Sequence, residues 1–556
     1  MKKTLTTILI FAAALAALLA VAALIERVRP EQESMPEVEA PAEVVNTLDE
    51  LGAAMITLNG DAASVTGLGA SAEGSTVTIV YPGTYRVSGE LADGQLIVDC
   101  GDFPGAVYLI LDGVSVTNSA GPALHVVQAD RTVIHLAEGT ENVFWDGADY
   151  LVSETVRQAA RESSGAAIYS ADDLVIEGEG GLTAYGLSAD GIRSKDGITV
   201  TGGEITVYAQ DDAIQGSDYV TVEGGSLTLN AYGDGITAKD GNVTVTDGIV
   251  DIISAGDGVD AAKDVNITGG ELSVLAWQGA EHYVDAVIAG VSAKGVKGQN
   301  VTVTGGAVTL DTAGDGLHAD DSLTVTGGEI TIASGDDAMH GDDMLTVTGG
   351  TVTVTTSYEA MEAAGVRVDG GMLTVTAQTN GVDAGEDGFI MTAGLVTLTA
   401  AKPVTSEGTF AVQSGTVYLT ATEAGAPVSF ADGSVTGGTV VALAQGTEGE
   451  LTADVIPGSF VYVLPRVQAA GTALTLADAA GQDVLNATAA QPFSGVMIAS
   501  GGLGVGQSYT LTVGEYTLTG ALSEGATVLR GEVTNTGFGG MGGPSGGMRP
   551  GPGMMP

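Results

Sequence analysis

The chain has 556 residues, with 19 basic and 69 acidic side chains, and its formal charge is -50. A charge of this sign argues against nucleic acid and anionic membrane surfaces as direct partners, because both are bound through clustered Lys and Arg. The 84 glycines beside only 15 prolines exclude collagen, and 44% hydrophobic residues argue against a mainly disordered chain. A single cysteine, Cys100, excludes a disulfide framework and a Cys-rich zinc site. We expect a folded β protein punctuated by glycine.

The N-terminus reads Met1-Lys2-Lys3, followed by an apolar run over residues 5–25. Such a run is typical of an export signal, with a small-residue cleavage site at 20–22. It is also long enough to span a bilayer uncleaved, so residues 1–25 are either a signal peptide or a membrane anchor. In both cases the body of the protein is expected to be secreted or attached to the cell surface. Residues 26–55 are acidic and contain prolines, which predicts an extended linker.

Between the linker and the C-terminal region one pattern recurs: an alternating strand of Val, Thr and Ile, a pair of glycines, and a second alternating strand. Examples are ITVTGGEITV at 198–207 and LTVTGGTVTV at 345–354. The last glycine of each pair recurs every 21 to 23 residues from Gly181 to Gly438, apart from one step of 36 between Gly270 and Gly306. A fixed period of about 22 residues indicates a solenoid, in which each repeat packs on its neighbours.

The residue types select the kind of solenoid. Alternating β-branched residues and Thr favour strands, and about 22 residues with two clear strands and a short third one make one coil of a parallel β-helix. We expect an all-β, single-stranded, right-handed parallel β-helix over 56–438, because parallel crossovers are almost always right-handed. The glycine pairs would supply positive φ at one corner of every coil. Residues 439–530 are expected to form a β-rich cap or small domain, and the Gly/Met/Pro-rich residues 531–556 a disordered tail.

The 36-residue step contains an insertion near 277–294. In solenoids such insertions often lie on the binding face. A second loop near 146–165 interrupts the early coils.

An acidic motif opens the third strand of each coil, as in GDGI at 233–236 and DDAM at 336–339, and a second acid follows five or six residues later. Stacking of the coils predicts that each set forms a file along the rod. The file of the first set is Asp190, Asp212, Asp234, Asp257, Asp315 and Asp337, continued by Glu359 and Asn380; the second is Asp196, Asp218, Asp240 and Asp343, together with Asp264 and Asp321. Asp211 and Asp336 directly precede two members of the first file and are counted with the first set as candidate ligands.

Carboxylates about 5 Å apart repel each other by about 3 kcal/mol at an effective dielectric near 20. A file of carboxylates therefore requires protonation, interleaved lysines such as Lys195, Lys239 and Lys263, or divalent cations. We expect calcium, a hard cation that accepts carboxylates and carbonyls in irregular geometry, with the aspartates of both sets except Asp264 and Asp321 as its ligands. The alternative is that these aspartates cap turns through Asx hydrogen bonds and are solvated.

Several aromatic residues precede the acidic motif: Tyr185, Tyr208, Tyr232, Trp277 and Tyr358. Rings arranged along an acidic groove would bind the faces of sugars. Ordinary packing at the corner of each coil explains the same residues equally well.

An enzymatic reading is the alternative to binding. The paired aspartates in QDDAI at 210–214 and GDDAMHGDD at 335–343 resemble those of β-helix polygalacturonases, and an inverting hydrolase requires two carboxylates. Every coil shares this position, however, and the companion Gly-His-Gly and Arg-Ile-Lys motifs are absent from the sequence. A pectate lyase would need an arginine base beside calcium aspartates, for which Arg193 is the candidate. We therefore assign no catalytic residue and keep a polysaccharide lyase or hydrolase as an alternative.

Three stretches carry a resemblance to a known family: GTYRVSGELADGQLIVD at 83–99, AIYSADDLVIEGEGGLTAYGLSADGIRSKDGITVTGGEITV at 167–207, and FSGVMIASGGLGVGQSYTLTVG at 493–514. Over about residues 56–530 the chain resembles the carbohydrate-binding-domain proteins of clostridial-type bacteria, which are secreted, calcium-carrying β-helices similar to pectate lyases. The resemblance implies noncatalytic binding of polysaccharide, either cellulose or a pectic uronan, with calcium among the Asp loops. A structural surface rod or adhesin, retained by residues 5–25, is a further alternative.

Overall fold

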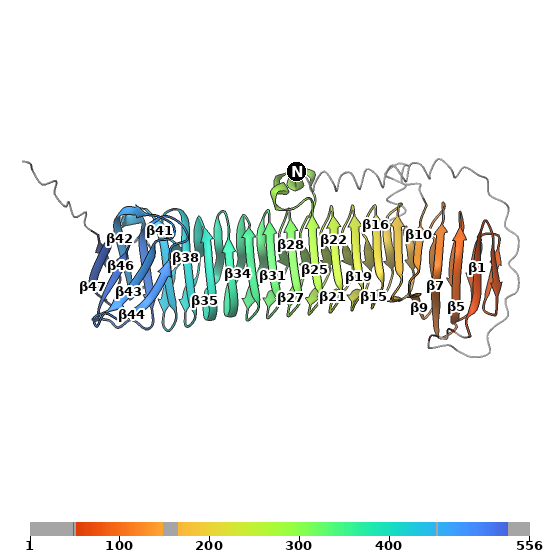
Figure 1. The fold of residues 1–556 in the computed structure, drawn as a ribbon, viewed down its shortest axis with the longest axis horizontal. Coiled ribbons are helices and arrows are strands. Elements are labelled where there is room, and N and C mark those ends of the chain that lie inside the picture. Colours follow the sequence, from red (N-terminus) through yellow and green to blue (C-terminus); the bar gives the residue numbers. More distant parts are fainter. Residues whose placement is uncertain are drawn as a thin grey trace, which may run out of the picture.

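The computed structural model describes residues 48, 50, 52–147, 165–446, 448–451 and 454–531. The predicted export segment, nearly all of the predicted linker, the predicted tail beyond residue 531 and most of the early loop lie outside the described residues. Within them the chain winds into a parallel β-helix of about 15 turns with 3% helix, which confirms the predicted fold class. The coils stack along one axis and form a rod (Figure 1). Among the described residues, no helix is both long and apolar enough to cross a membrane.

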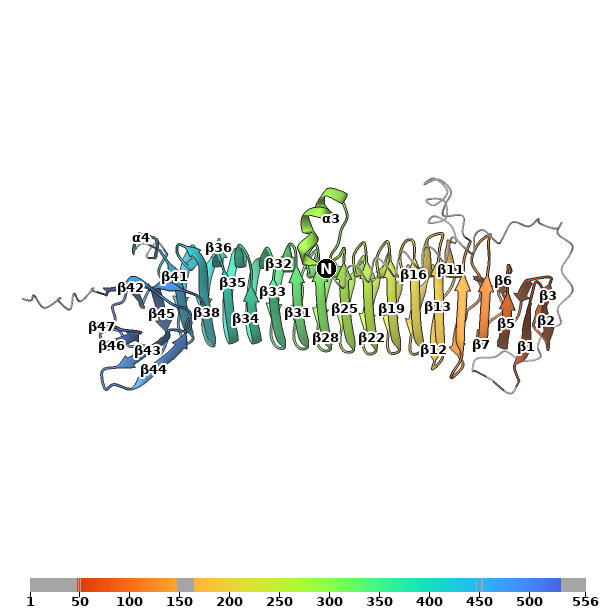
Figure 2. The same cartoon turned by 45° about the horizontal axis from the view of Figure 1, so that its top comes forward.

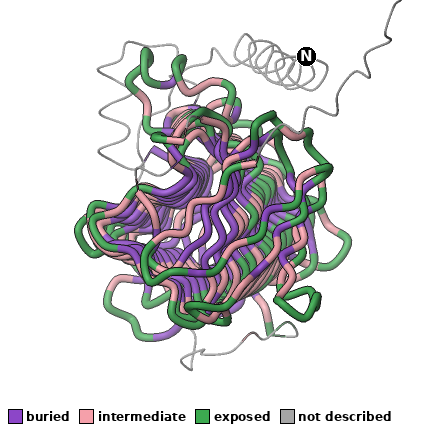
Figure 3. Tube along the Cα trace, turned by 90° about the vertical axis from the view of Figure 1, so that its left-hand side faces the viewer, coloured by how far each residue is buried: buried purple, intermediate pink, exposed green. Residues whose placement is uncertain are grey.

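Alternation along each strand places one set of side chains inside the coils. In β22 (Ile249–Ser254), for example, Val250 and Ile252 are buried while Asp251 between them is exposed. The buried residues of successive coils form one continuous core from Ala54 to Ala499. Seen along the rod, they lie inside the stack and exposed residues lie mainly at its corners (Figure 3).

Each regular coil contributes three strands, and equivalent strands of successive coils pair in parallel to give three long sheets. Sheet I contains β10 (Glu141–Trp145), β13 (Gly181–Gly186), β16 (Glu204–Ala209), β19 (Ser226–Ala231), β22, β25 (Glu271–Ala276), β28 (Ala307–Thr312), β31 (Glu329–Ser334), β33 (Thr351–Thr356), β38 (Thr416–Ala424) and β41 (Thr439–Gln445).

Sheet II contains β4 (Thr76–Ile79), β6 (Gln95–Asp99), β8 (Leu124–Gln128), β11 (Ala166–Ser170), β14 (Asp190–Ser194), β17 (Ile214–Gly216), β20 (Ile236–Ala238), β23 (Val259–Ala261), β26 (Val296–Gly298), β29 (Leu317–Ala319), β36 (Lys402–Ser406) and β39 (Val428–Ser429).

Sheet III contains β9 (Arg131–Leu136), β12 (Leu174–Gly178), β15 (Gly197–Val200), β18 (Tyr219–Val222), β21 (Asn242–Val245), β24 (Asp264–Ile267), β27 (Asn300–Val303), β30 (Leu323–Val325), β37 (Thr409–Val412) and β40 (Asp432–Val435). Five longer strands bend from one sheet into the next: β5 (Gly83–Leu91), β7 (Ala106–Thr117), β32 (Asp337–Val347), β34 (Glu359–Thr376) and β35 (Asn380–Ala400).

The glycine pairs turn the chain from sheet III into sheet I, as predicted. The last glycine of the corner has a positive φ, between 74° and 100°, at every corner from Gly203 to Gly415, although Asp, Ala or Ser replaces the first glycine before Gly248, Gly394 and Gly415. Gly181 and Gly438, at the two ends of the series, do not have a positive φ. The corners also stack closely, because a Cβ added at Gly225 would lie 2.9 Å from the carbonyl oxygen of Gly203 in the preceding coil. Glycine is therefore required there both by backbone conformation and by space.

The insertion predicted near 277–294 forms the short helix η2 (Ala280–His282) and the helix α3 (Tyr283–Ala289) between β25 and β26. Figure 2 shows α3 standing out from the side of the rod. The chain leaves the coil at Trp277 and Gln278, both of which have positive φ.

The two ends of the described region differ from the regular coils. At the N-terminal end β1 (Ala54–Gly60) pairs with β2 (Ala63–Thr66) in antiparallel fashion, and β3 (Ala70–Glu73) pairs in the same way with β4. At the C-terminal end β41 is followed by α4 (Glu448–Leu451), β42 (Ser459–Gln468), β45 (Phe493–Ser500) and β48 (Thr527–Arg530). A separate antiparallel sheet consists of β43 (Ala473–Asp478), β44 (Asp483–Thr488), β46 (Ser508–Val513) and β47 (Tyr516–Ala521).

Candidate functional site: a buried file of aspartates beside sheet II

The acidic motifs stack at the start of the strands of sheet II. Ile192 pairs with Ile214, Ile214 with Ile236, and Ile236 with Val259, so the aspartates two residues before them fall into line. The aspartate file, as we call it, runs through Asp190, Asp212, Asp234, Asp257, Lys294, Asp315, Asp337, Glu359 and Asn380. The first predicted file is confirmed, and Lys294 takes the place of an acid in the interrupted coil.

Backbone amides of the next coil fix these carboxylates. The Asp234 N–H donates to Asp212 Oδ1 at 2.9 Å, the Asp257 N–H to Asp234 Oδ1 at 2.7 Å, and the Asp337 N–H to Asp315 Oδ1 at 3.1 Å. The aspartates therefore cap the neighbouring coil, and not their own turn as the Asx alternative proposes. They are also not simply solvated, because Asp190 is only 1% exposed and Asp257 only 2%.

A second column, which we call the partner file, lies three residues after the aspartate file. Its strand register aligns Arg193, Gln215, Thr237, Asp260, Lys297, His318, His340, Glu362 and Asp383. Of these residues only Arg193 was predicted from the sequence as a candidate site residue. The signal that could have revealed the others is the constant spacing of three residues after each acid.

Basic members of the partner file form ion pairs with some members of the aspartate file. Arg193 Nη1 lies 3.3 Å from Asp190 Oδ2, and His318 Nδ1 lies 2.8 Å from Asp315 Oδ2. Lys294 also pairs with Asp315. Although burial acts in the opposite direction, His318 and Lys294 hold the pKa of Asp315 well below its usual range. The lysines expected to relieve the repulsion, Lys195, Lys239 and Lys263, are instead exposed.

The file is least compensated around Asp234, where the neighbouring side chains of Gln215 and Thr237 carry no positive charge. Gln215 and Thr237 are 2% and 6% exposed, and Gln215 Oε1 and Thr237 Oγ1 have no hydrogen-bond partner. Gln215 Nε2 donates to Asp212 Oδ2 at 2.7 Å, which places its amide beside the aspartate file. Burial, together with the carboxylates of Asp212 and Asp257, raises the pKa of Asp234 to about 8. We call Asp212, Gln215, Asp234 and Thr237 the oxygen cluster.

The oxygen cluster has the donor chemistry that calcium requires. Carboxylate, amide carbonyl and hydroxyl oxygens are hard ligands, and a cation among them would satisfy the two buried oxygens and offset the repulsion between Asp212 and Asp234. The remaining predicted calcium ligands of the first set, Asp211 and Asp336, are partly buried and directly precede Asp212 and Asp337.

The second predicted file is not continuous. Asp196 and Asp218 lie in register, and so do Asp321 and Asp343. Ala238 pairs with Ala261 and Val243 with Val265, so the intervening segment that contains Asp240 has one residue more than its neighbour. The expectation that Asp264 continues the second file after Asp240 is therefore wrong, because this extra residue shifts the register locally. Asp218, Asp240 and Asp343 are exposed, and Asp196 is partly buried.

The predicted aromatic residues do not form one row. Tyr185 stacks on Tyr208 with ring centroids 5.2 Å apart, and on Trp145, which was not predicted, at 3.6 Å. Stacking uses ring faces that would otherwise contact a sugar, so this ladder presents mainly ring edges. Tyr232 and Tyr358 lie in other columns and are 55% and 46% exposed. Trp277 packs against the core at the base of the insertion.

The insertion returns directly onto the aspartate file. Ser292 Oγ donates to Asp257 Oδ1 at 2.8 Å, and the Lys294 N–H donates to the same oxygen at 2.7 Å. The helical protrusion therefore stands next to the candidate site, as expected of a solenoid insertion.

Comparison with known proteins assigns the chain to a protein family. A family model described as carbohydrate-binding domain-containing protein matches residues 73–338 and 336–456, more than half of the chain. The chain therefore belongs to this family of carbohydrate-binding proteins.

Two individual proteins are similar to parts of the chain. A carbohydrate-binding domain-containing protein of Acetivibrio thermocellus is 38% identical over 141 residues, which are 25% of this chain and 48% of the relative. The chain thus matches about half the length of that curated relative. The structure of a polysaccharide lyase-like protein from C. thermocellum, a gadolinium derivative, is 30% identical and covers 40% of this chain and 92% of its own, with a TM-score of 0.37.

Proposed function

We propose that this protein is an exported, noncatalytic polysaccharide-binding β-helix that holds calcium in the oxygen cluster and uses it to bind an acidic polysaccharide of the pectic uronan type. The observation that carries the proposal is the pair of buried oxygens without a hydrogen-bond partner, Gln215 Oε1 and Thr237 Oγ1, beside Asp212 and Asp234. Cellulose, the other expected ligand, serves as the comparison in the test.

The energetic argument favours a cation at this position. A buried polar atom without a partner costs about 1–3 kcal/mol, and the oxygen cluster contains two such atoms in adjacent coils. Protonation of Asp234 would relieve the carboxylate repulsion but would supply a single O–H donor, so at least one of the two oxygens would stay unpaired. A single calcium ion would bind the two carboxylates and the two unpaired oxygens of the oxygen cluster, because calcium accepts six to eight oxygen ligands in flexible geometry.

The charge of the chain supports calcium as the bridge to the ligand. A protein of charge -50 repels a uronan unless a cation lies between the two sets of carboxylates. Tyr232 precedes Asp234 by two residues and is 55% exposed, so part of its ring faces the solvent, where a sugar would contact it.

The surroundings of Arg193 favour binding over catalysis. The arginine is 8% exposed, and its guanidinium contacts Asp190 rather than standing in an open cleft. A lyase base must reach the sugar proton that it removes.

Retention on insoluble pectate and on cellulose, measured with calcium and with a chelator, tests the proposal. We expect calcium-dependent retention on pectate, and a loss of about fivefold to tenfold in calcium affinity for Thr237→Val, which removes one ligand oxygen. Thr244→Val, at a partly exposed position of sheet III, is the matched control. Equal retention on pectate with and without the chelator would overturn the calcium bridge. Release of unsaturated products or of new reducing ends would overturn the noncatalytic assignment.

Export is the second part of the proposal and depends on residues 1–25. N-terminal sequencing of the protein recovered from the culture medium or from the cell surface would identify either a cleaved signal or a retained anchor. Recovery only from the cytosol would contradict it.

A further inference from the structure

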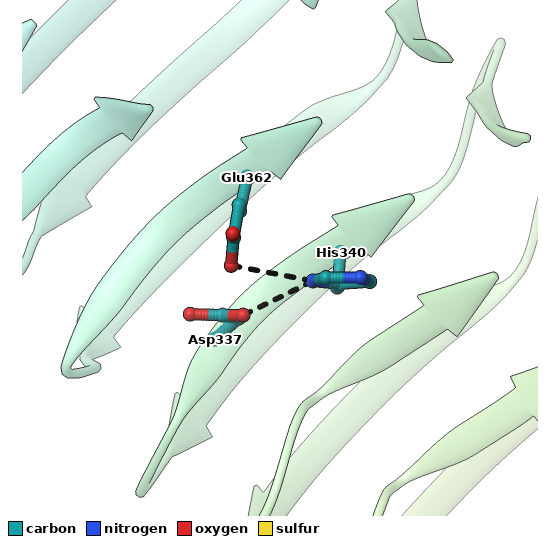
Figure 4. Close-up of side chains that lie close together, drawn as sticks. All are labelled: Asp337, His340 and Glu362. Atoms are coloured by element: carbon teal, nitrogen blue, oxygen red, sulfur yellow. Dashed lines mark hydrogen bonds and ion pairs between the residues drawn. The ribbon is translucent and has the colours of Figure 1, made fainter. Parts of the chain in front are cut away.

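A second group of potential ligands lies on sheet II, away from the oxygen cluster. Asp337 and His340 belong to β32 and Glu362 to the neighbouring strand β34 (Figure 4). In Figure 4 both carboxylates point toward the imidazole ring of His340. One ligand atom from each residue lies within 4.8 Å of the other two.

The separations match those around a small, four-coordinate metal ion. His340 Nδ1 lies 3.1 Å from Asp337 Oδ2 and 3.4 Å from Glu362 Oε2. Ligands about 2.1 Å from a tetrahedral ion are about 3.4 Å from one another, as simple geometry requires. Small side-chain movements would therefore admit the ion.

The other nitrogen of the ring has the partner that a metal-binding histidine usually has. His340 Nε2 lies 3.0 Å from Asp342 Oδ1. A carboxylate at this position fixes the tautomer and leaves Nδ1 as the ligand atom.

The preceding coil provides an internal comparison. His318 stacks on His340 with ring centroids 4.7 Å apart and likewise contacts two carboxylates, those of Asp315 and Asp320. At His318, however, Lys294 Nζ lies 3.0 Å from Nδ1, so an ammonium group occupies the position that a metal would take. The chain therefore contains one histidine position suited to a metal beside one that is blocked.

We infer that Asp337, His340 and Glu362 bind a borderline divalent transition metal of the zinc type, with an open coordination position. Imidazole nitrogen is a good ligand for zinc, whereas calcium prefers oxygen alone, so the donor set distinguishes this site from the oxygen cluster. The side chains of Asp337, His340 and Glu362 are 10%, 19% and 45% exposed, so the Glu362 side faces solvent. Water, or an oxygen of the bound sugar, would complete the coordination.

Zinc binding to the full chain without a histidine tag tests the inference. Titration against a chromogenic zinc chelator measures affinity and stoichiometry, and Co²⁺ substitution reports four-coordinate geometry through its visible absorption. We expect one zinc per chain, a loss of affinity of at least tenfold in His340→Gln and Glu362→Gln, and a loss of about tenfold in Asp342→Asn. The matched control His318→Gln should change affinity less than threefold.

Two outcomes would overturn the inference: the absence of stoichiometric zinc uptake, or equal losses in His318→Gln and His340→Gln. Displacement of zinc by an equal concentration of calcium would do the same. Because Glu362 is 45% exposed, its substitution should leave the fold intact, and circular dichroism of each variant checks this. The result is independent of sugar binding, because no polysaccharide is present in the assay.

Discussion

Asp234 illustrates how one residue combines structure and chemistry in this protein. Its Oδ1 caps the next coil through the Asp257 amide, yet among the described residues its carboxylate forms no ion pair with Arg, Lys or His. Its neighbours in the aspartate file are also acids, so the energy of this position depends on whether a proton or a cation is present.

The pH dependence of stability follows from the pKa of Asp234. Its folded-state pKa is about 8, whereas an unfolded Asp titrates near 3.9, so between about pH 4 and pH 8 the folded chain retains a proton that the unfolded chain has lost. In the presence of a chelator, the contribution of Asp234 to the free energy of unfolding therefore falls as pH rises through this window.

We expect Asp234→Asn, which keeps the hydrogen-bond acceptor but removes the charge, to raise Tm at pH 8 and to leave it nearly unchanged at pH 4. Thermal unfolding at both pH values, with chelator, measures this difference. Asp240→Asn, at an exposed position, is the control and should change neither value. A variant less stable than the native chain at pH 8 would contradict the argument.

Variants at Tyr232 and Tyr208 distinguish a contribution to sugar binding from a contribution to packing. We expect Tyr232→Ala to weaken pectate binding by a few fold with little change in Tm, because this ring is mostly exposed. We expect Tyr208→Ala to lower Tm by several degrees, since it removes the stacking on Tyr185, while pectate binding is unchanged. Binding isotherms and thermal melts of the two variants make the comparison, and the reverse pattern would identify the ladder as the sugar platform.

At the scale of the element, the glycine corner between sheets III and I and the strand of sheet II have different functions in the coil. The glycine corner repeats almost without variation because successive corners contact each other through their backbones. The start of each sheet II strand varies from coil to coil, with Arg, Gln, Thr, Asp, Lys, His or Glu in the partner file. One edge of the coil therefore maintains the fold while the other carries the chemistry.

A corner glycine should be intolerant of substitution. At Gly350 φ is 81°, and an added Cβ would lie 2.8 Å from the backbone of Gly327. We expect Gly350→Ala to lower the free energy of unfolding by about 1–3 kcal/mol, since both the conformation and the contact are unfavourable. Denaturant unfolding measures the loss. Gly121→Ala, where the nearest atom lies 4.0 Å from the added Cβ, is the control and should be nearly neutral.

At the scale of the whole molecule, the charge of -50 and the long rod act together. Acids placed in a file along the axis repel one another in the folded state, and cations or salt reduce this repulsion. The fold remains stable because the core is continuous through the coils and each coil packs on two others.

Without calcium, stability should therefore increase with ionic strength. We expect raising NaCl to about 0.5 M, in the presence of a chelator, to increase Tm by several degrees, because screening weakens repulsion between exposed acids. Calcium should raise Tm further at a much lower concentration, because it binds only the folded state. Scanning calorimetry under the three conditions tests this order. Equal effects of calcium and of NaCl at matched ionic strength would argue against specific sites.

The sequence by itself determined the period, the parallel β-helix, the glycine corner and the aspartate file. It could do so because coils that stack at a constant period bring equivalent residues into register. Residues that recur at the same position of the sequence repeat therefore lie next to one another along the rod. It also located the insertion of α3, since a longer step must leave the coil as a loop.

Only the tertiary structure decided which side chains meet across the coils. The contacts of the partner file depend on how far each side chain reaches toward an aspartate, as with His318 at Asp315. The break in the second file depends on a single extra residue near Asp240, and the ring ladder depends on Trp145 from an earlier coil. These features arise from contacts between chain segments 20 to 40 residues apart, and the repeat pattern, which describes only what the coils share, does not contain them.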